Sequence, residues 1–208
     1  HPEEEEEEEA SEIRRRANKA RLDKKQPRGL LYKAKCYLAC QLQFGDFDEV
    51  KREHDYFKEK TKDLGLTVLS PLDRMFISFE MESKEMHFIL KEKLKSGNYD
   101  YVHEQAKLIR NRDLAACDAS LFIVAKLNPN LPATGLIDEV ITSKRNGRPV
   151  FLILESGYVS CPIWLCGYFK PSWVYRSYDE VIEKLFEIDA GKVSLNSKTW
   201  KILEEKFR

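Results

Sequence analysis

Two carboxylates flank a buried strand in the middle of this 208-residue chain. Asp113 precedes the apolar run at residues 120–127, and Glu139 lies in the first turn of a helix expected over residues 135–146, directly after Asp138. In an open α/β sheet, ligands bind outside the carboxyl ends of the strands, so this loop and helix start are where chemistry is expected. Carboxylates can transfer protons or attack as nucleophiles.

An ordinary structural role explains the same residues. Thr134 is a good helix N-cap, and acidic residues near a helix N-terminus are stabilised by the macrodipole by about 0.3–1 kcal/mol. Asp113 could likewise cap a helix or pair with Arg110 or Arg112. Both interpretations stay open on the residues alone.

The elements that would position these carboxylates alternate between strands and helices. Strands are expected at residues 32–42, 67–69, 120–127, 149–154 and 173–176. Helical patterns occupy residues 49–64, 84–94, 102–116, 135–146, 179–188 and 194–207. A β-α-β order with a short connection predicts a right-handed parallel crossover. The sequence therefore predicts an α/β fold, doubly wound, with a flavodoxin-like or Rossmann-like parallel sheet of about five strands.

One connection, residues 73–112, is unusually long. Its stretch MFISFEMES, residues 75–83, is apolar and charge-poor where a loop is normally polar. We interpret it either as a lid or subunit contact over the strand ends, or as a longer packed connection.

Composition excludes several classes of function. The 35 basic residues balance the 35 acidic residues, so no direct nucleic-acid binding is expected. No apolar run approaches the roughly 20 residues that cross a bilayer, and the first residues lack the basic, apolar, small-residue order of a signal peptide. We expect a soluble, cytoplasmic protein without membrane contact.

Motifs for metals and common cofactors are also missing. The chain has five cysteines and four histidines without metal-site spacing, so buried free thiols are expected. Neither GxGxxG nor GxxxxGK[ST] occurs, so standard dinucleotide and P-loop nucleotide sites are not supported. No cofactor is expected.

The ends of the chain differ from its centre. A glutamate run at residues 3–9 gives way to basic residues, and like-charge blocks of this kind usually stay solvated. We expect a charged N-terminal appendage over residues 1–28, an α/β domain over residues 29–190 and a helical C-terminal extension over residues 191–208.

Several short motifs occur in order along the core: CYLA at 36–39, VLSP at 68–71, DLAACDAS at 113–120, GLIDE at 135–139 and GRPV at 147–150. Together they resemble the nucleoside 2-deoxyribosyltransferase family and its relatives, the nucleoside 5′-monophosphate N-glycosidases. The family's opening strand is commonly tyrosine-leucine-alanine-glycine. It then has an aspartate, a buried strand, a glycine, the catalytic glutamate four residues later, and a glycine-lysine-proline-valine strand start. The resemblance covers most of the core and implies the same kind of fold.

The resemblance implies a two-step cleavage of an N-glycosidic bond. Glu139 would attack the anomeric carbon of a nucleoside or nucleotide, and a second base or water would resolve the glycosyl-enzyme with net retention. Asp113 would donate a proton or hydrogen bond to the departing base. Tyr37 would orient the nucleophile.

Substrate-binding residues and a partner follow from the same resemblance. Thr134 and Gly135 would present a hydroxyl and a backbone N–H near the sugar or a phosphate. Asp73 and Arg74 follow the second strand, where a phosphate could reach Arg74. Sites of the family are often completed by a neighbouring subunit, so a homo-oligomer is expected, and the aromatic-rich residues 158–173 would suit that contact.

Departures from the family pattern keep a second hypothesis open. Ala133 stands where the transferases usually have an aspartate, residues 140–142 are bulkier, and Cys40 and Gln41 replace a glycine and a proline. These changes fit a changed substrate, such as a modified nucleotide, or a nucleotide-binding or interaction module that has lost chemistry. A redox role for Cys36 or Cys40 is less favoured, because no CxxC sequence occurs.

Overall fold

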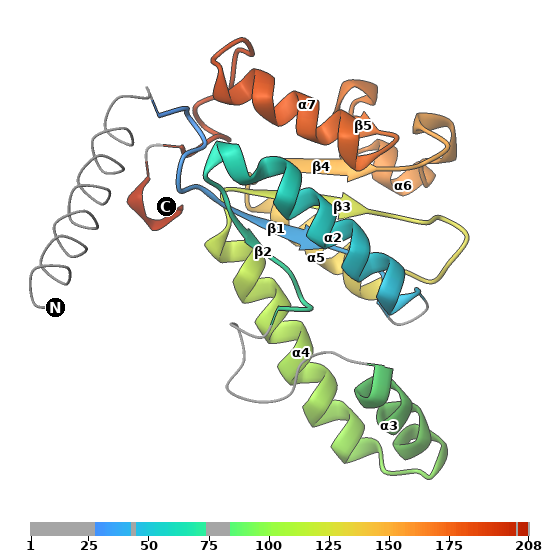
Figure 1. Ribbon diagram of the computed structural model, residues 1–208. Helices are drawn as coiled ribbons and strands as arrows, with labels where there is room; N and C mark the ends of the chain where they lie inside the picture. Colours follow the sequence, from blue (N-terminus) through green and yellow to red (C-terminus); the bar gives the residue numbers. More distant parts are fainter. Residues whose placement is uncertain (1–27, 43–44, 74–83, 203, 208) are drawn as a thin grey trace, which may run out of the picture.

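Five parallel strands form one sheet in the order β2-β1-β3-β4-β5 (Figure 1). A computed structural model describes residues 28–42, 45–73, 84–202 and 204–207. The strands are β1 (Lys35–Ala39), β2 (Thr67–Leu69), β3 (Phe122–Lys126), β4 (Val150–Ile153) and β5 (Val174–Tyr175). The predicted α/β fold is confirmed, with the strand order of flavodoxin-like proteins. The segments at residues 1–27 and 75–83 lie outside the described residues.

Helices cover both faces of the sheet. They are α2 (Phe47–Thr61), α3 (Lys84–Lys95), α4 (Tyr99–Ala119), α5 (Thr134–Arg145), α6 (Ile163–Cys166) and α7 (Tyr178–Asp189). Successive strand residues point to opposite faces, so Cys36 and Leu38 join the core under α2 and α7. Tyr37 and Ala39 join the core under α4, α5 and α6. This alternation directs Tyr37 toward the α4–α5 side.

The helix ends follow capping chemistry. The Asp46 carboxylate accepts hydrogen bonds from two backbone amides at the start of α2, and the Ser177 hydroxyl caps α7 in the same way. Gly147 follows α5 with φ +72°, a left-handed conformation that glycine adopts without strain. None of the helices in the described part of the chain is both long and apolar enough to cross a bilayer.

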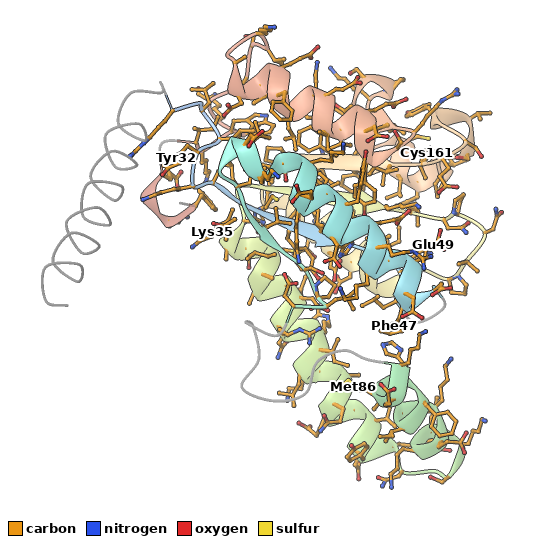
Figure 2. The ribbon with its side chains drawn as sticks, viewed as in Figure 1. Tyr32, Lys35, Phe47, Glu49, Met86 and Cys161 are labelled. Atoms are coloured by element: carbon orange, nitrogen blue, oxygen red, sulfur yellow. The ribbon has the colours of Figure 1, made fainter. Side chains whose placement is uncertain are left out.

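Helices α3 and α4 form a hairpin that extends beyond the sheet (Figure 1). The C-terminal half of α4 packs on β1 and α5, whereas α3 has no buried residue. The start of α3 is fixed to the start of α2, because Lys84 Nζ lies 2.5 Å from Asp48 Oδ2 and the rings of His87 and Phe47 meet edge to face at 5.4 Å. Figure 2 labels Phe47 at the start of α2 and Met86 near the start of α3.

The end of the chain differs from the helix expected over residues 194–207. Its described residues contain turns and one 3-10 helix, Glu205–Phe207, so that prediction is wrong. Aromatic packing explains the difference, because Trp200 lies against Phe122 and Phe151 at ring-centroid distances of 5.8 and 5.9 Å. The segment thus contributes to the core under α2 and α7. Other 3-10 helices are Lys62–Leu64, Tyr158–Ser160 and Pro171–Trp173.

Candidate functional site

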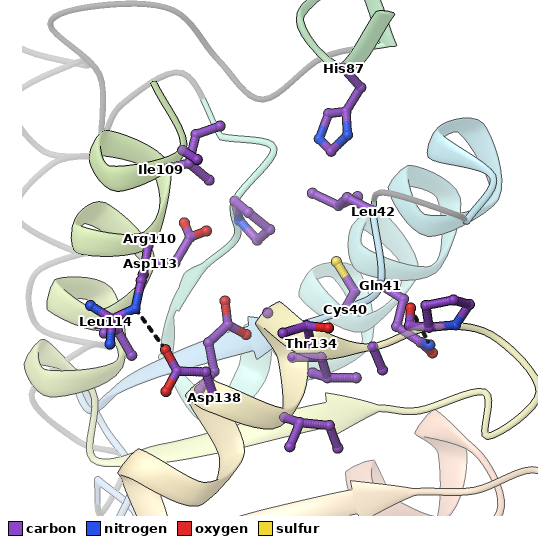
Figure 3. A pocket seen from close by; sticks show the side chains of 18 of the residues that line it. Cys40, Gln41, Leu42, His87, Ile109, Arg110, Asp113, Leu114, Thr134 and Asp138 are labelled. Atoms are coloured by element: carbon purple, nitrogen blue, oxygen red, sulfur yellow. Dashed lines mark hydrogen bonds and ion pairs between the residues drawn. The ribbon is translucent and has the colours of Figure 1, made fainter. Parts of the chain in front are cut away.

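A cavity of about 710 Å³ opens at the carboxyl end of β1. The sheet order reverses between β1 and β3, and open α/β sheets bind ligands in the crevice outside such a point. The walls come from the residues after β1, from α3 and α4, and from the start of α5 with the loop before it. Figure 3 shows Asp113 and Ile109 on α4 at one side, His87 above and Thr134 below.

Glu139 and Tyr37 meet at the base of the cavity. The Tyr37 hydroxyl donates a hydrogen bond of 3.4 Å to Glu139 Oε1, and the two side chains are 1% and 8% exposed. Burial raises the pKa of Tyr37 well above its usual value, and the charges of Glu139 and Asp113 raise it further. Tyr37 therefore stays a neutral hydrogen-bond donor at ordinary pH.

The position of Glu139 in its helix corrects one expectation. Helix α5 begins at Thr134, so Glu139 is its sixth residue and lies in the second turn, not in the first. Its carboxylate faces inward toward both the sheet and α4. Consistent with this, burial and then the charge of Glu139 raise the pKa of the Cys117 thiol on α4.

Asp113 lines the same cavity from α4. It is 8% exposed, and its Oδ1 lies 2.9 Å from Arg112 Nη2. Arg110, the other cation considered as its partner, instead donates from Nε to Asp138 Oδ2 at 2.9 Å (Figure 3). The structure thus brings Asp113, Glu139 and Tyr37 to one cavity, whose wall also contains the Arg110–Asp138 ion pair.

Thr134 and Gly135 are the first two residues of α5 and both line the cavity. The expected N-cap is Thr134, but the capping position belongs to Ala133, whose side chain makes no capping hydrogen bond, so that expectation is wrong. A Cβ added at Gly135 would meet no atom within 4 Å. The space in front of this first turn is therefore open to a ligand.

The structure gives no support to the predicted substrate-binding role of the two remaining residues, Asp73 and Arg74. The Asp73 carboxylate pairs with Lys58 Nζ at 2.6 Å and accepts a hydrogen bond from Ser70 N at 3.1 Å. It borders only a small hollow beside Tyr37 and Asp113 and does not line the main cavity. Arg74 lies outside the described residues.

Gln41 is a residue of the site that sequence reasoning did not assign a role. Its side-chain amide donates to the backbone oxygens of Asn128, Leu131 and Pro132, at 3.1, 3.1 and 3.4 Å. It thereby fixes the loop between β3 and α5, which carries Thr134 into place. Its position directly after the first strand was the available signal.

The arrangement can support acid–base and nucleophilic chemistry. Two mostly buried carboxylates, Glu139 and Asp113, approach one cavity from different helices, and a neutral phenol, Tyr37, donates to one of them. Among the described residues, no cluster of three histidine, cysteine or carboxylate side chains could hold a metal ion. The five cysteines are free thiols.

Comparison with known proteins does not assign this chain to a family. No protein-family model matches this chain, and no curated protein is significantly similar to it in sequence. The resemblance to nucleoside deoxyribosyltransferases therefore depends on short motifs and their order, and the activity that it implies stays a prediction.

Proposed function

We propose that this protein cleaves the N-glycosidic bond of a nucleoside or nucleotide and transfers the sugar to water or to another base. The observation that carries the proposal is the Tyr37–Glu139 hydrogen bond, in a cavity whose wall also contains Asp113. Retaining glycoside cleavage uses one carboxylate as the nucleophile and a second as the acid and base, and Glu139 and Asp113 offer such a pair.

In the first step, Glu139 attacks the anomeric carbon as the bond to the base nitrogen breaks. The bonding electron pair leaves with the base, and Asp113, when protonated, supplies the proton that neutralises it. Tyr37 donates to Oε1 of Glu139 and so limits rotation of the carboxylate. The products are a free base and a sugar esterified to Glu139.

In the second step, water or another base attacks the anomeric carbon. Asp113, now ionised, accepts the proton of the attacking molecule, and Glu139 leaves as a carboxylate. Two inversions at the anomeric carbon give net retention. The first turn of α5, with Thr134 and Gly135, borders the cavity where the sugar or its phosphate would bind.

A second candidate function is nucleoside binding without chemistry. The ion pair between Arg112 and Asp113 favours it, because an ionised carboxylate accepts hydrogen bonds and has no proton to donate. In that case ligands would bind in the cavity but no base would be released.

Base release tests the proposal directly. Ribonucleosides, 2′-deoxyribonucleosides and their 5′-monophosphates are incubated with the protein, with and without a second base, and free base is measured by chromatography. We expect Glu139→Gln to lower release at least about 1,000-fold, because the amide is a poor nucleophile. Glu104→Gln is the control, since it makes the same change at an exposed position of α4 that does not line the cavity.

Trapping the intermediate separates the two candidates. A 2′-fluorinated substrate slows both steps, and a retained sugar mass on the tryptic peptide containing Glu139 would support covalent catalysis. If ligands bind with measurable heat while neither base release nor a labelled peptide is found, the protein is a binding module and the proposed activity is wrong.

A further inference from the structure

The cavity continues beyond the carboxylates into an apolar chamber between three helices. Six apolar side chains from α3, α4 and α5 line it: Leu90, Leu94, Val102, Ile109, Ile137 and Ile141. The polar side chains that these helices add to the cavity, besides Asp113, Thr134 and Glu139, are His87, Lys91, Arg110 and Asp138. We refer to this part of the cavity as the apolar chamber. The sugar and the reacting bond need polar contacts, so this chamber must serve another part of a ligand.

One face of α4 connects the chamber to Asp113. Val102, Ala106, Ile109 and Asp113 all line the cavity and are spaced by four, three and four residues, which places them on one side of a helix. At 1.5 Å per residue, Ile109 lies about 6 Å and Val102 about 16 Å along the axis from Asp113. A group bound at Asp113 therefore has an apolar surface directly beside it.

Helix α3 supplies the facing wall. It contains no buried residue, so Leu90 and Leu94 do not serve the protein core. The helix is nevertheless held over the cavity through Lys84 and Asp48 and through His87 and Phe47. Figure 3 shows His87 extending from α3 above the cavity, with Ile109 on α4 at its side.

The size of the cavity exceeds what a plain nucleoside uses. Its volume of about 710 Å³ is in the upper part of the range of roughly 300–1,000 Å³ that buries drug-sized ligands. The extra volume is bounded mainly by aliphatic carbon, which favours apolar groups.

We propose that the apolar chamber binds an alkyl or aryl substituent on the base of the substrate, so that the preferred substrates are base-modified nucleosides or nucleotides. This inference rests on the proposed function, in which Asp113 faces the departing base. A substituent on that base extends along the α4 face from Asp113 toward Ile109 and Val102. A benzyl-sized group is expected to strengthen binding about 10- to 100-fold.

The test measures binding apart from turnover. The Glu139→Gln protein is titrated by calorimetry with 2′-deoxyadenosine and N6-benzyl-2′-deoxyadenosine, and with 2′-deoxyuridine and 5-benzyl-2′-deoxyuridine. The ribose forms are used in parallel. Base release from the same compounds is measured with the unmodified chain. We expect the benzyl compound of at least one pair to bind at least 10-fold more tightly than its parent.

Variants test whether the preference for benzyl compounds arises in the apolar chamber. Ile109→Trp fills it, and Leu94→Asp, at a side chain that is 53% exposed and therefore tolerant of change, places a charge in it. Each should reduce the ratio of benzyl to parent affinity at least 10-fold. Leu108→Trp is the matched control, because Leu108 is 62% exposed and does not line the cavity.

The outcomes separate this inference from the proposed function. Equal affinity for parent and benzyl compounds overturns the chamber assignment, even if base release is observed. A preference that Ile109→Trp removes, without any base release, supports the chamber and contradicts the enzymatic activity. If light scattering shows a dimer that Ile109→Trp dissociates, the chamber is an interface between two copies and the inference is wrong.

Discussion

Gln41 and Asn128 exchange two hydrogen bonds across the carboxyl ends of β1 and β3. Gln41 Nε2 donates to Asn128 O at 3.1 Å, and Asn128 N donates to Gln41 Oε1 at 2.5 Å. The same amide nitrogen also donates to Leu131 O and Pro132 O. A single side chain thus holds the loop whose end becomes the first turn of α5.

Gln41→Glu should loosen this loop. The substitution keeps the size of the side chain but places a carboxylate against three carbonyl oxygens, which we expect to lower the free energy of unfolding by about 1–2 kcal/mol. KM for the proposed base release should rise more than kcat falls, because the start of α5 borders the cavity. Urea unfolding and steady-state kinetics measure the two effects. Gln105→Glu makes the same change on α4, away from the loop, and should alter neither quantity appreciably.

Gly135→Ala should change stability and binding in opposite directions. The new methyl group would meet no protein atom within 4 Å, and alanine favours a helix over glycine by about 0.5–1 kcal/mol. The same methyl group projects where the ligand would approach, so substrate affinity should fall. Thermal unfolding and ligand titration measure the two effects.

Gly147→Ala provides the control for that prediction. It too would meet no atom within 4 Å, but φ at this position is +72°, so alanine is strained and stability should fall by about 1–2 kcal/mol. If both alanine variants destabilise the protein equally, backbone conformation does not explain the difference and the argument for Gly135 fails.

Local patterns predicted the frame of the site. The apolar runs that became β1 and β3 favoured a parallel sheet buried on both faces, and strand alternation then places Tyr37 on the same face as Ala39. The helix beginning at Thr134 carries Glu139 to the same face. These relationships depend on periodicity within a few residues, and so the sequence contained them.

The sequence did not predict which charged side chains pair with one another. Arg110 and Arg112 are both close to Asp113 along the chain, yet Arg112 pairs with it and Arg110 pairs with Asp138, because the choice depends on how α4 packs against α5. The contacts of Gln41 with residues 128–132 and the core position of Trp200 likewise join segments that are distant in sequence.

The buried side chain of His54 should make the folded protein less stable at acid pH. It is 1% exposed in α2, its Nδ1 lies 2.8 Å from Ser70 Oγ, and burial lowers its pKa from 6.5 to about 3. Below pH 6.5 the unfolded chain therefore binds a proton at His54, whereas the folded protein binds it only as the pH approaches 3. Stability is complete above pH 6.5 and declines as the pH falls toward 3, by about 2 kcal/mol at pH 5.

Replacing the imidazole tests this dependence. His54→Asn keeps a polar atom near Ser70 and removes the titrating group, so the difference in unfolding free energy between wild type and variant should narrow from pH 7 to pH 5. The exposed His103→Asn change should leave the slope intact. If the difference in unfolding free energy between wild type and His54→Asn is constant over that interval, His54 binds protons equally in the folded and unfolded states, and its pKa is not lowered by folding.

Tyr37→Phe should weaken the proposed cleavage of the N-glycosidic bond without a change in its pH profile. The phenol donates at 3.4 Å, a long hydrogen bond, so its loss should lower kcat/KM about 10-fold. Because burial and the charges of Glu139 and Asp113 hold the pKa of Tyr37 far above 10, the ratio of wild-type to variant kcat/KM should stay constant from pH 6 to pH 9.

The control is Tyr178→Phe in the opposite core, where the hydroxyl has no hydrogen-bond partner among the described residues. That variant should retain full kcat/KM and unfold at an equal or higher temperature. A ratio for Tyr37→Phe that falls within this pH range would mean that the phenol ionises during turnover, and its role would then be that of a base and not of a fixed donor.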